Sequence, residues 1–512
     1  MIRRIGRIDS KSTSLYLITF CIAISFWTAA YPFSRAFLKT QITYNEGWNA
    51  YNAMKVAEHQ PLYPTAYGWT SVNYPALSFH LIAALGRFPS NYLFTGRFLS
   101  LAGLCLSGLM AGLIVWQITR AKLAAGLSGL FLVAVFCANA KGYVGMDDPQ
   151  MLAQFFFMAG LYVYLKGNRS GWALEFTALL FVVGGNIKHS LIEFPLAVLL
   201  DLLFTSPRKA LRYAFAGTLM AVISVVLTIR IDGSAYISPL LASRGYSWKG
   251  AILQACDVLL PILPFALVAL WMARYCWKIP AQRVLALLLF CALPLNTYFS
   301  GGSGVTINSM FGSTLAIVLL VGVFLGEFFK LPRGQLKSVA PPVVIAAFFL
   351  WLAVPMVIAG DPLIISATIY PSHIDYSGNW RTDLALERSL AGRQRFSEEV
   401  TFLRQQPGPA LCESLLRCYY GGKPYLYDPF DATRFLALGK LDANVMVSRL
   451  QNHEFGAVQM SSSVEEKLGG RWPDGHFAPP ILRAIQQYYS PGFTNEDGII
   501  YIPKIQEPIK KS

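Results

Sequence analysis

Long stretches without charged side chains recur through the first 360 residues, separated by short polar connections. No Asp, Glu, Lys or Arg occurs in the ranges 12–34, 98–119 and 338–360. A helix needs about 20 apolar residues to cross the roughly 30 Å hydrocarbon core of a bilayer. The pattern therefore predicts a polytopic α-helical membrane protein with about eleven spans, at 13–34, 96–118, 123–140, 149–165, 171–187, 190–205, 211–229, 251–273, 284–299, 307–328 and 338–359.

Two of these spans, 171–187 and 190–205, rest on the weakest pattern. Each is short, and they contain Glu175 and Glu193. One broken element that runs through both ranges is the alternative prediction.

The composition supports a membrane protein and excludes other classes. Hydrophobic residues make up 54% of the chain and charged residues 14%, whereas a soluble domain carries roughly 25% charged residues. The same balance excludes disordered, collagen-like and coiled-coil proteins.

The net charge of +15 indicates topology. Lysine and arginine residues fall on alternate connections, beginning with Arg3–Lys11 and followed by Arg120–Lys122, and this side is cytoplasmic by the positive-inside rule. The N-terminal segment is basic and then apolar, but its apolar run is too long for a signal peptide, so we expect a retained first span. An odd number of spans then places the C-terminal segment outside the cytoplasm. No basic patch with interleaved aromatics stands apart from the span flanks, so we expect no nucleic-acid partner.

Three regions follow from the polarity of the chain. Residues 1–359 form the membrane domain, 360–375 a linker, and 376–512 a mixed-charge segment. In this last segment a helical pattern covers Arg388–Gln405, and strand-like runs occur at Pro424–Tyr427, Ala443–Val447 and Ile499–Ile502. We therefore predict a small extracytoplasmic α/β domain.

The largest connection, residues 35–95, contains an apolar run at Ala76–Leu85. This run predicts a helix that lies in the membrane interface. In the extracytoplasmic segment, Cys412 and Cys418 could form a disulfide in an oxidising compartment. Two unpaired buried thiols are the alternative.

Four polar clusters lie on the extracytoplasmic side of the predicted spans. The first contains Glu46, a candidate general base if a pocket shields it, or an ordinary loop acid. The second is Asp147-Asp148 before Pro149, where one carboxylate could face a cavity, or both could cap the following helix.

The third cluster is Lys188-His189, which could hold a phosphate, although Lys188 could instead extend to the membrane surface. Arg97 adds another candidate phosphate ligand or an interfacial anchor. The fourth is the Gly-rich turn 300–308, which could approach an anion or serve as a flexible connector. Together the clusters predict a cavity with acids for proton transfer and cations for phosphate.

The first connection also carries a set of short motifs. Their order and spacing resemble the first-loop pattern of bacterial GT-C-fold integral membrane glycosyltransferases, related to protein O-mannosyltransferases and aminoarabinose transferases. The matching elements are acid-Gly at Glu46-Gly47, Leu62-Tyr63-Pro64, Tyr74-Pro75 and Gly96-Arg97-Phe98-Leu99-Ser100. Asp148 is similar to the family's second-loop acid, Lys188 to its lysine at a membrane-facing mouth, and Asn308 to a later Gly-x-x-x-Asn element.

This sequence departs from the family pattern at three positions. Many relatives carry Asp-Glu in the first loop, but the first of these positions is Asn45 here. Tyr-Pro-Pro becomes Tyr-Pro-Ala at Ala76, and an acid that often follows the late asparagine is replaced by Gly312. These departures leave the sugar and the metal dependence open.

The resemblance implies transfer of a sugar from a polyprenyl-phosphate donor to a glycan, lipid or protein acceptor, with inversion, at the outer face of a bacterial plasma membrane. Glu46, or alternatively Asp148, would deprotonate the acceptor hydroxyl. The lipid phosphate and sugar would be bound by Arg97, Lys188, His189, Tyr63, Tyr74 and Asn308. No cofactor is certain; a divalent cation on Asp147 and Asp148 remains open, and fixed cations would make it unnecessary.

Two other classes are compatible with a polytopic chain. A transporter or flippase of lipid-linked saccharides would have pseudo-symmetric halves and broken helices near the midplane, and no internal repeat is visible. A non-catalytic membrane scaffold would not explain why Glu46, Asp148 and Lys188 all lie on the extracytoplasmic side of the predicted spans.

Overall fold

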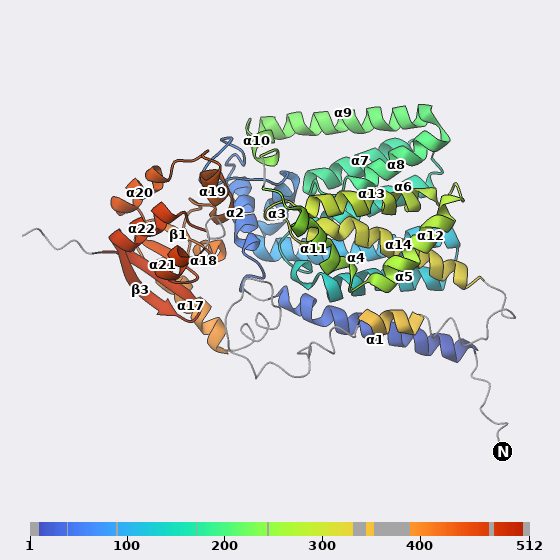
Figure 1. Cartoon of the computed structure of the whole chain (residues 1–512), viewed down its shortest axis with the longest axis horizontal. Helices are drawn as coiled ribbons and strands as arrows, with labels where there is room; N and C mark the ends of the chain where they lie inside the picture. The colour runs from blue at the N-terminus through green and yellow to red at the C-terminus, as the bar shows by residue number, and fades with distance from the viewer. Residues whose placement is uncertain are drawn as a thin grey trace, which may run out of the picture.

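The computed structural model describes residues 10–37, 39–88, 91–169, 171–242, 245–330, 345–352, 390–470 and 476–504. A bundle of long helices forms one part of the molecule, and an α/β domain lies at one end of the bundle (Figure 1). Two helices of the first connection, α2 (Asn45–Ala57) and α3 (Leu77–Gly86), lie between these parts.

The predicted spans correspond to helices of the bundle. These are α1 (Ser10–Arg35), α4 (Tyr92–Thr119), α5 (Lys122–Asn139), α6 (Gln150–Lys166), α7 (Ala173–Ile187), α8 (Glu193–Thr205), α9 (Pro207–Asp232), α11 (Trp248–Leu259), α12 (Leu263–Trp277), α13 (Arg283–Ser300) and α14 (Phe311–Phe328). Of the last predicted span, 338–359, only 345–352 is described, and it is helical. By length and composition, six described helices could cross a membrane, or seven if one bent pair counts as a single span.

Two details of the bundle differ from or refine the prediction. The range 251–273 was predicted as one span, but α11 and α12 meet there at an angle of 93°. Pro261 and Pro264 lie at the break, where proline removes a backbone donor and interrupts a helix. The pair 171–187 and 190–205 forms two helices, because Lys188 is extended at the end of α7 (φ −152°).

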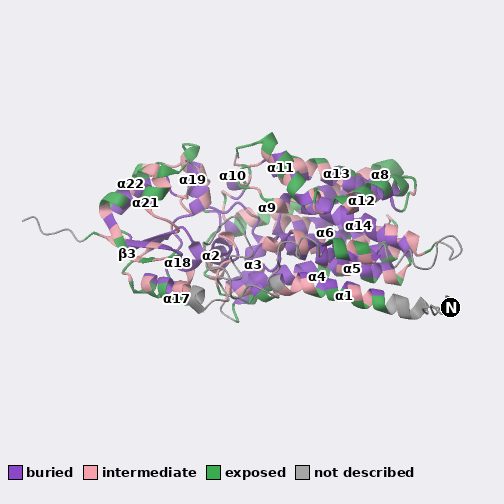
Figure 2. Ribbon diagram, turned by 60° about the horizontal axis from the view of Figure 1, so that its bottom comes forward, coloured by how far each residue is buried: buried purple, intermediate pink, exposed green. Residues whose placement is uncertain are grey.

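Burial distinguishes the inner helices from the outer ones. In its most apolar window, α14 is 94% buried, whereas α9 is 0% buried although its mean hydropathy there is 2.0. Figure 2 shows buried residues concentrated inside the bundle and exposed residues on its outer helices. An apolar helix without protein neighbours on most of its surface is suited to contact with lipid.

The C-terminal part is an α/β domain, as predicted. Its elements are α17 (Leu390–Gln405), β1 (Ala410–Cys412), α18 (Leu415–Tyr420), α19 (Pro429–Ala437), α20 (Ala443–Gln451), β2 (Ala457–Met460), α21 (Val464–Gly469), α22 (Pro479–Tyr488), β3 (Tyr489–Asn495) and β4 (Gly498–Pro503). The sheet order is β1-β2-β4-β3, with β1 parallel to β2 and the other pairs antiparallel.

Two strand predictions in this domain were wrong. Ala443–Val447 lies in helix α20, because Asp442 caps its first turn and Met446 and Leu450 bury one face at helical spacing. Pro424–Tyr427 has no regular structure, whereas Ile499–Ile502 does belong to β4. The predicted linker, 360–375, lies outside the described residues, so the domain boundaries stay a prediction.

The α/β domain is attached to the first connection by a disulfide-bonded turn. Cys412 and Cys418 form a disulfide, with their Cα atoms 5.9 Å apart. The turn between them packs against α2 so closely that a Cβ atom on Gly47 would lie 2.3 Å from the backbone nitrogen of Leu416. This contact explains why glycine follows Glu46 in the first-loop motif.

Candidate functional site

A cavity of about 1140 Å³ opens at the end of the bundle that carries the α/β domain. Most of its wall comes from five separate stretches of the chain, namely 41–45, 138–146, 188–190, 250–261 and 298–309, and the single residues Tyr74, Leu240 and Tyr246 complete it. The last stretch includes a short 3-10 helix, η2 (Ile307–Met310). Phe430 of the α/β domain covers Gly304 on the rim, and the ring centroid of His476 lies 5.8 Å from that of Tyr44.

Lys188 occupies the wall of this cavity and is held by two neighbours. Its Nζ lies 3.2 Å from Oδ2 of Asp148 and 3.4 Å from the ring centroid of Tyr74. The Tyr74 hydroxyl donates to the same Asp148 oxygen over 3.3 Å. Asp148 also accepts from the backbone N–H of Gln150 at the start of α6 (2.8 Å). Asp148 therefore caps a helix and also holds a lysine at the cavity.

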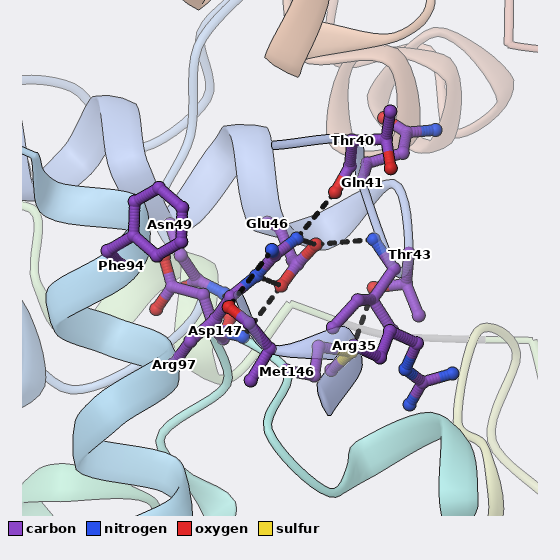
Figure 3. Close-up of polar contacts among 12 residues, drawn as sticks. Arg35, Thr40, Gln41, Thr43, Glu46, Asn49, Phe94, Arg97, Met146 and Asp147 are labelled. Atoms are coloured by element: carbon purple, nitrogen blue, oxygen red, sulfur yellow. Dashed lines mark hydrogen bonds and ion pairs between the residues drawn. The ribbon is translucent and has the colours of Figure 1, made fainter. Parts of the chain in front are cut away.

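Glu46 and Arg97 form a buried ion pair behind the wall. The side chains are 0% and 1% exposed, and Arg97 donates to both carboxylate oxygens over 2.7 and 2.6 Å. Glu46 also accepts from the backbone N–H groups of Ile42 (2.5 Å) and Asp147 (2.9 Å). Figure 3 shows Glu46 and Arg97 pointing toward each other from α2 and α4. The pair joins α4 to the first connection and to the loop before α6.

Asp147 is buried next to this ion pair and is not among the residues that line the cavity. A Cβ atom on Gly96 would lie 1.8 Å from Asp147 Oδ1, which explains the glycine before Arg97 in the motif. Burial, and next the Glu46 carboxylate, raise the pKa of Asp147 well above its usual value, against the opposing effect of Arg97.

The structure thus divides the predicted site residues into two groups. Four of them line the cavity, namely Lys188, His189, Tyr74 and Asn308. The others lie behind the wall, namely Glu46, Arg97, Asp147, Asp148 and Tyr63. Tyr63 donates its hydroxyl to the backbone oxygen of Tyr74 (2.6 Å), so it supports a wall residue from behind.

Two charged residues of the wall were missing from the prediction. Lys141 lies in a short 3-10 helix, η1 (Lys141–Tyr143), after α5, and Asp257 is an exposed residue of α11. Asp257 had a signal in the sequence, because a carboxylate within an apolar segment is expensive at membrane depth. Lys141 looked like one more basic residue at the end of a span.

A metal centre finds no support in the described part of the chain. No group of three or more His, Cys, Asp or Glu side chains lies there in an arrangement that could hold a metal ion. Asp147 and Asp148 are turned to different partners, one toward Gly96 and one toward Lys188.

Comparisons with known proteins were made by sequence and by structure. No model of a known family matches the chain, and no curated protein matches its sequence. Among solved structures, ArnT from Cupriavidus metallidurans bound to undecaprenyl phosphate matches with a TM-score of 0.60 at 13% identity, over 96% of this chain and 98% of that chain. Its apo state gives a TM-score of 0.60 at 13% identity, over 95% and 97%.

The chain has the GT-C fold. The match covers the bundle and the α/β domain together, so the resemblance seen in residues 46–101 extends to the architecture of nearly the whole chain. An Archaeoglobus fulgidus oligosaccharyltransferase tethered to an acceptor peptide gives a TM-score of 0.47 at 12% identity, over 97% of this chain and 75% of that chain. With its apolar helices, this GT-C protein is an integral membrane protein.

Proposed function

We propose that this protein transfers a sugar from a polyprenyl-phosphate donor to an acceptor hydroxyl in the cavity. The fold supports this reaction class, and a solved protein of the same fold was crystallised with undecaprenyl phosphate. The observation that carries the proposal is that Lys141, Lys188 and His189 all line one cavity beside membrane helices.

These three side chains suit the leaving phosphate. Transfer breaks the bond between the sugar and the phosphate, so negative charge grows on the phosphate oxygens in the transition state. Fixed cations aimed at that charge lower the barrier. The cavity is also lined by Tyr74, which lies beside Lys188, and by Asn308, and these side chains are available to contact the sugar.

The ion pairs behind the wall are suited to positioning. Asp148 holds Lys188 at the cavity, and an arriving phosphate competes with it for the ammonium group. Glu46 and Arg97 fix the loop that carries the cavity residues 41–45. This geometry favours supporting roles over the base role predicted for Glu46, because all of its contacts are to protein groups and its side chain is buried.

The membrane setting follows from the donor. A polyprenyl chain keeps the donor in the bilayer, so the cavity must be reached from lipid. We propose that the cavity and the α/β domain face the extracytoplasmic side of a bacterial plasma membrane, in keeping with the basic connections at the opposite ends of the spans. The acceptor is a glycan, lipid or protein hydroxyl, and single displacement inverts the anomeric carbon.

Binding of undecaprenyl phosphate tests the proposed phosphate site. Lys188→Gln should weaken binding about thirty-fold, since a hydrogen bond from a charged group to the phosphate contributes about 2 kcal/mol. The matched control is Lys166→Gln, at the exposed opposite end of α6. Lys141→Gln provides a second test at a less buried position. Unchanged affinity in both wall variants would contradict the proposed site.

A further inference from the structure

Asp257 stands out among the acidic residues of the described chain. It is the one carboxylate among the residues that line the cavity, and its side chain is exposed there. No hydrogen bond or ion pair joins it to another residue of the described ranges. It therefore differs from Glu46 and Asp148, whose carboxylates are engaged by protein groups.

The helix that carries Asp257 is fixed against the bundle. Ala251, Ala255 and Val258 form the buried face of α11, and Asp257 projects from another face. Gln254, one turn earlier and also on the cavity wall, donates to the backbone oxygen of Val305 over 3.4 Å. The carboxylate thus has a defined place on the wall of the same cavity that Lys188 lines.

Transfer to a hydroxyl needs a group that accepts its proton. Asn45 lines the cavity at the position where the related family carries an acid, and an amide is no base. Asp148 already accepts from Lys188, Tyr74 and the backbone of Gln150. A charged residue at membrane depth is costly and generally has a task.

We propose that Asp257 is the general base of the reaction, an inference that rests on the proposed function. The acceptor oxygen forms a bond to the anomeric carbon, and the bond from that carbon to the phosphate oxygen breaks. The phosphate leaves with the electron pair and is stabilised by Lys188, Lys141 and His189. The acceptor proton passes to a carboxylate oxygen of Asp257.

Replacement of Asp257 by asparagine separates proton transfer from donor binding. Asp257→Asn should lower kcat with a hydroxyl acceptor about 10²–10⁴-fold, the usual contribution of a general base. Its affinity for undecaprenyl phosphate should stay within a factor of about two, which also reports correct folding. Glu175→Gln, a carboxylate at the far end of α7 that pairs with Arg212, is the matched control and should keep full activity.

Azide provides a second readout, because this anionic nucleophile needs no base. Asp257→Asn should transfer the sugar to azide at the wild-type rate, forming a glycosyl azide and polyprenyl phosphate. Asp148→Asn, which disturbs Lys188, should lose transfer to hydroxyl and azide alike.

The outcomes distinguish this inference from the proposed function. If the wild-type protein releases no polyprenyl phosphate from any donor, with hydroxyl or azide, the proposed function fails. If the wild type is active, full activity of Asp257→Asn with hydroxyl acceptors overturns the inference. Equal loss with azide and hydroxyl also overturns the base role, since it indicates that Asp257 acts on the donor.

Discussion

Two ion pairs, Asp148–Lys188 and Glu46–Arg97, hold charged side chains of the site in place. Asp148 holds Lys188 at the cavity over 3.2 Å, and Arg97 engages both oxygens of the buried Glu46. Removing one member of such a pair leaves an uncompensated buried charge, which costs about 3–5 kcal/mol. Loss of activity on mutation of Glu46 or Arg97 is therefore expected from lost structure alone, without either residue touching substrate.

Asp428, in the α/β domain, is a buried acid whose surroundings favour its protonated form. Burial, and next the neighbouring Asp431, raise the pKa of Asp428 from 3.8 to about 7. Asp428 caps α19 by accepting from the backbone N–H groups of Phe430 and Asp431. Its backbone nitrogen also donates to the carbonyl of Trp69, so it links the α/β domain to the first connection.

This raised pKa predicts how stability depends on pH. Between pH 4 and 7 the unfolded state ionises Asp428 while the folded state keeps its proton, so the penalty on folding grows with pH and levels off above 7. Asp428→Asn keeps the cap and removes the penalty. Its Tm should exceed the wild-type value by a margin that widens from pH 4 to 7, measured by thermal unfolding of the full chain. A margin independent of pH would contradict this, with Asp442→Asn at the exposed cap of α20 as control.

The sequence predicted single residues where a chemical reason was visible in one segment. Lys188, His189, Tyr74 and Asn308 were named in advance and line the cavity. The partner of a charge was not predictable, because Glu46 and Arg97 are 51 positions apart and their contact depends on the fold. Asp257 did have a local signal, a carboxylate within an apolar segment, but only the fold shows that it lines the cavity while Glu46 and Asp148 are engaged by protein groups.

At the scale of single elements, helices α2 and α18 connect the α/β domain to the site. Helix α2 carries Glu46 on one turn, and the first residues of α18 (Leu415 and Leu416), within the disulfide-closed segment 412–418, pack on Gly47 of the same turn. Ser414, which immediately precedes α18, also donates to Gln41, a residue of the cavity wall, over 2.7 Å. The domain therefore sets where the first connection lies.

Replacement of Gly47 by alanine tests this contact. Alanine favours a helix over glycine by about 1 kcal/mol, but its Cβ would lie 2.3 Å from a backbone atom of Leu416. Overpacking of this kind costs about 1–3 kcal/mol, so Gly47→Ala should lower the Tm. Gly126→Ala in α5 is the matched control, because nothing lies within 4 Å of its added Cβ. A Tm that rises equally in both variants would contradict the proposed docking.

The sequence predicted the membrane helices well, because hydropathy alone identifies them. It predicted the short elements of the α/β domain poorly, because packing determines whether they form helices or strands. Ten predicted spans coincide with helices or a bent helix pair, because apolar length is a local property. The bend between α11 and α12 was missed, although prolines marked it. In the α/β domain, short apolar runs fit the spacing of a helix as well as that of a strand. The helix-capping residue Asp442 was the local signal that favoured helix α20.

On the scale of the whole molecule, the cavity exists because several distant stretches converge where the bundle meets the α/β domain. The GT-C architecture could be predicted from the spans and the first-loop motif, and the structural match confirms it at 13% identity. The convergence itself could not be predicted, since no local pattern states which loops share a wall. What the cavity offers chemically, three basic groups and one carboxylate lining the same space, emerges only at this scale.

The most direct test of this account is turnover of a panel of polyprenyl-phosphate sugars by the purified full-length protein with hydroxyl acceptors. We predict stoichiometric release of polyprenyl phosphate and formation of an inverted glycoside, lost in Lys188→Gln and kept in Lys166→Gln. Movement of intact donor across a vesicle membrane without cleavage, or turnover unaffected by Lys188→Gln, would contradict the account.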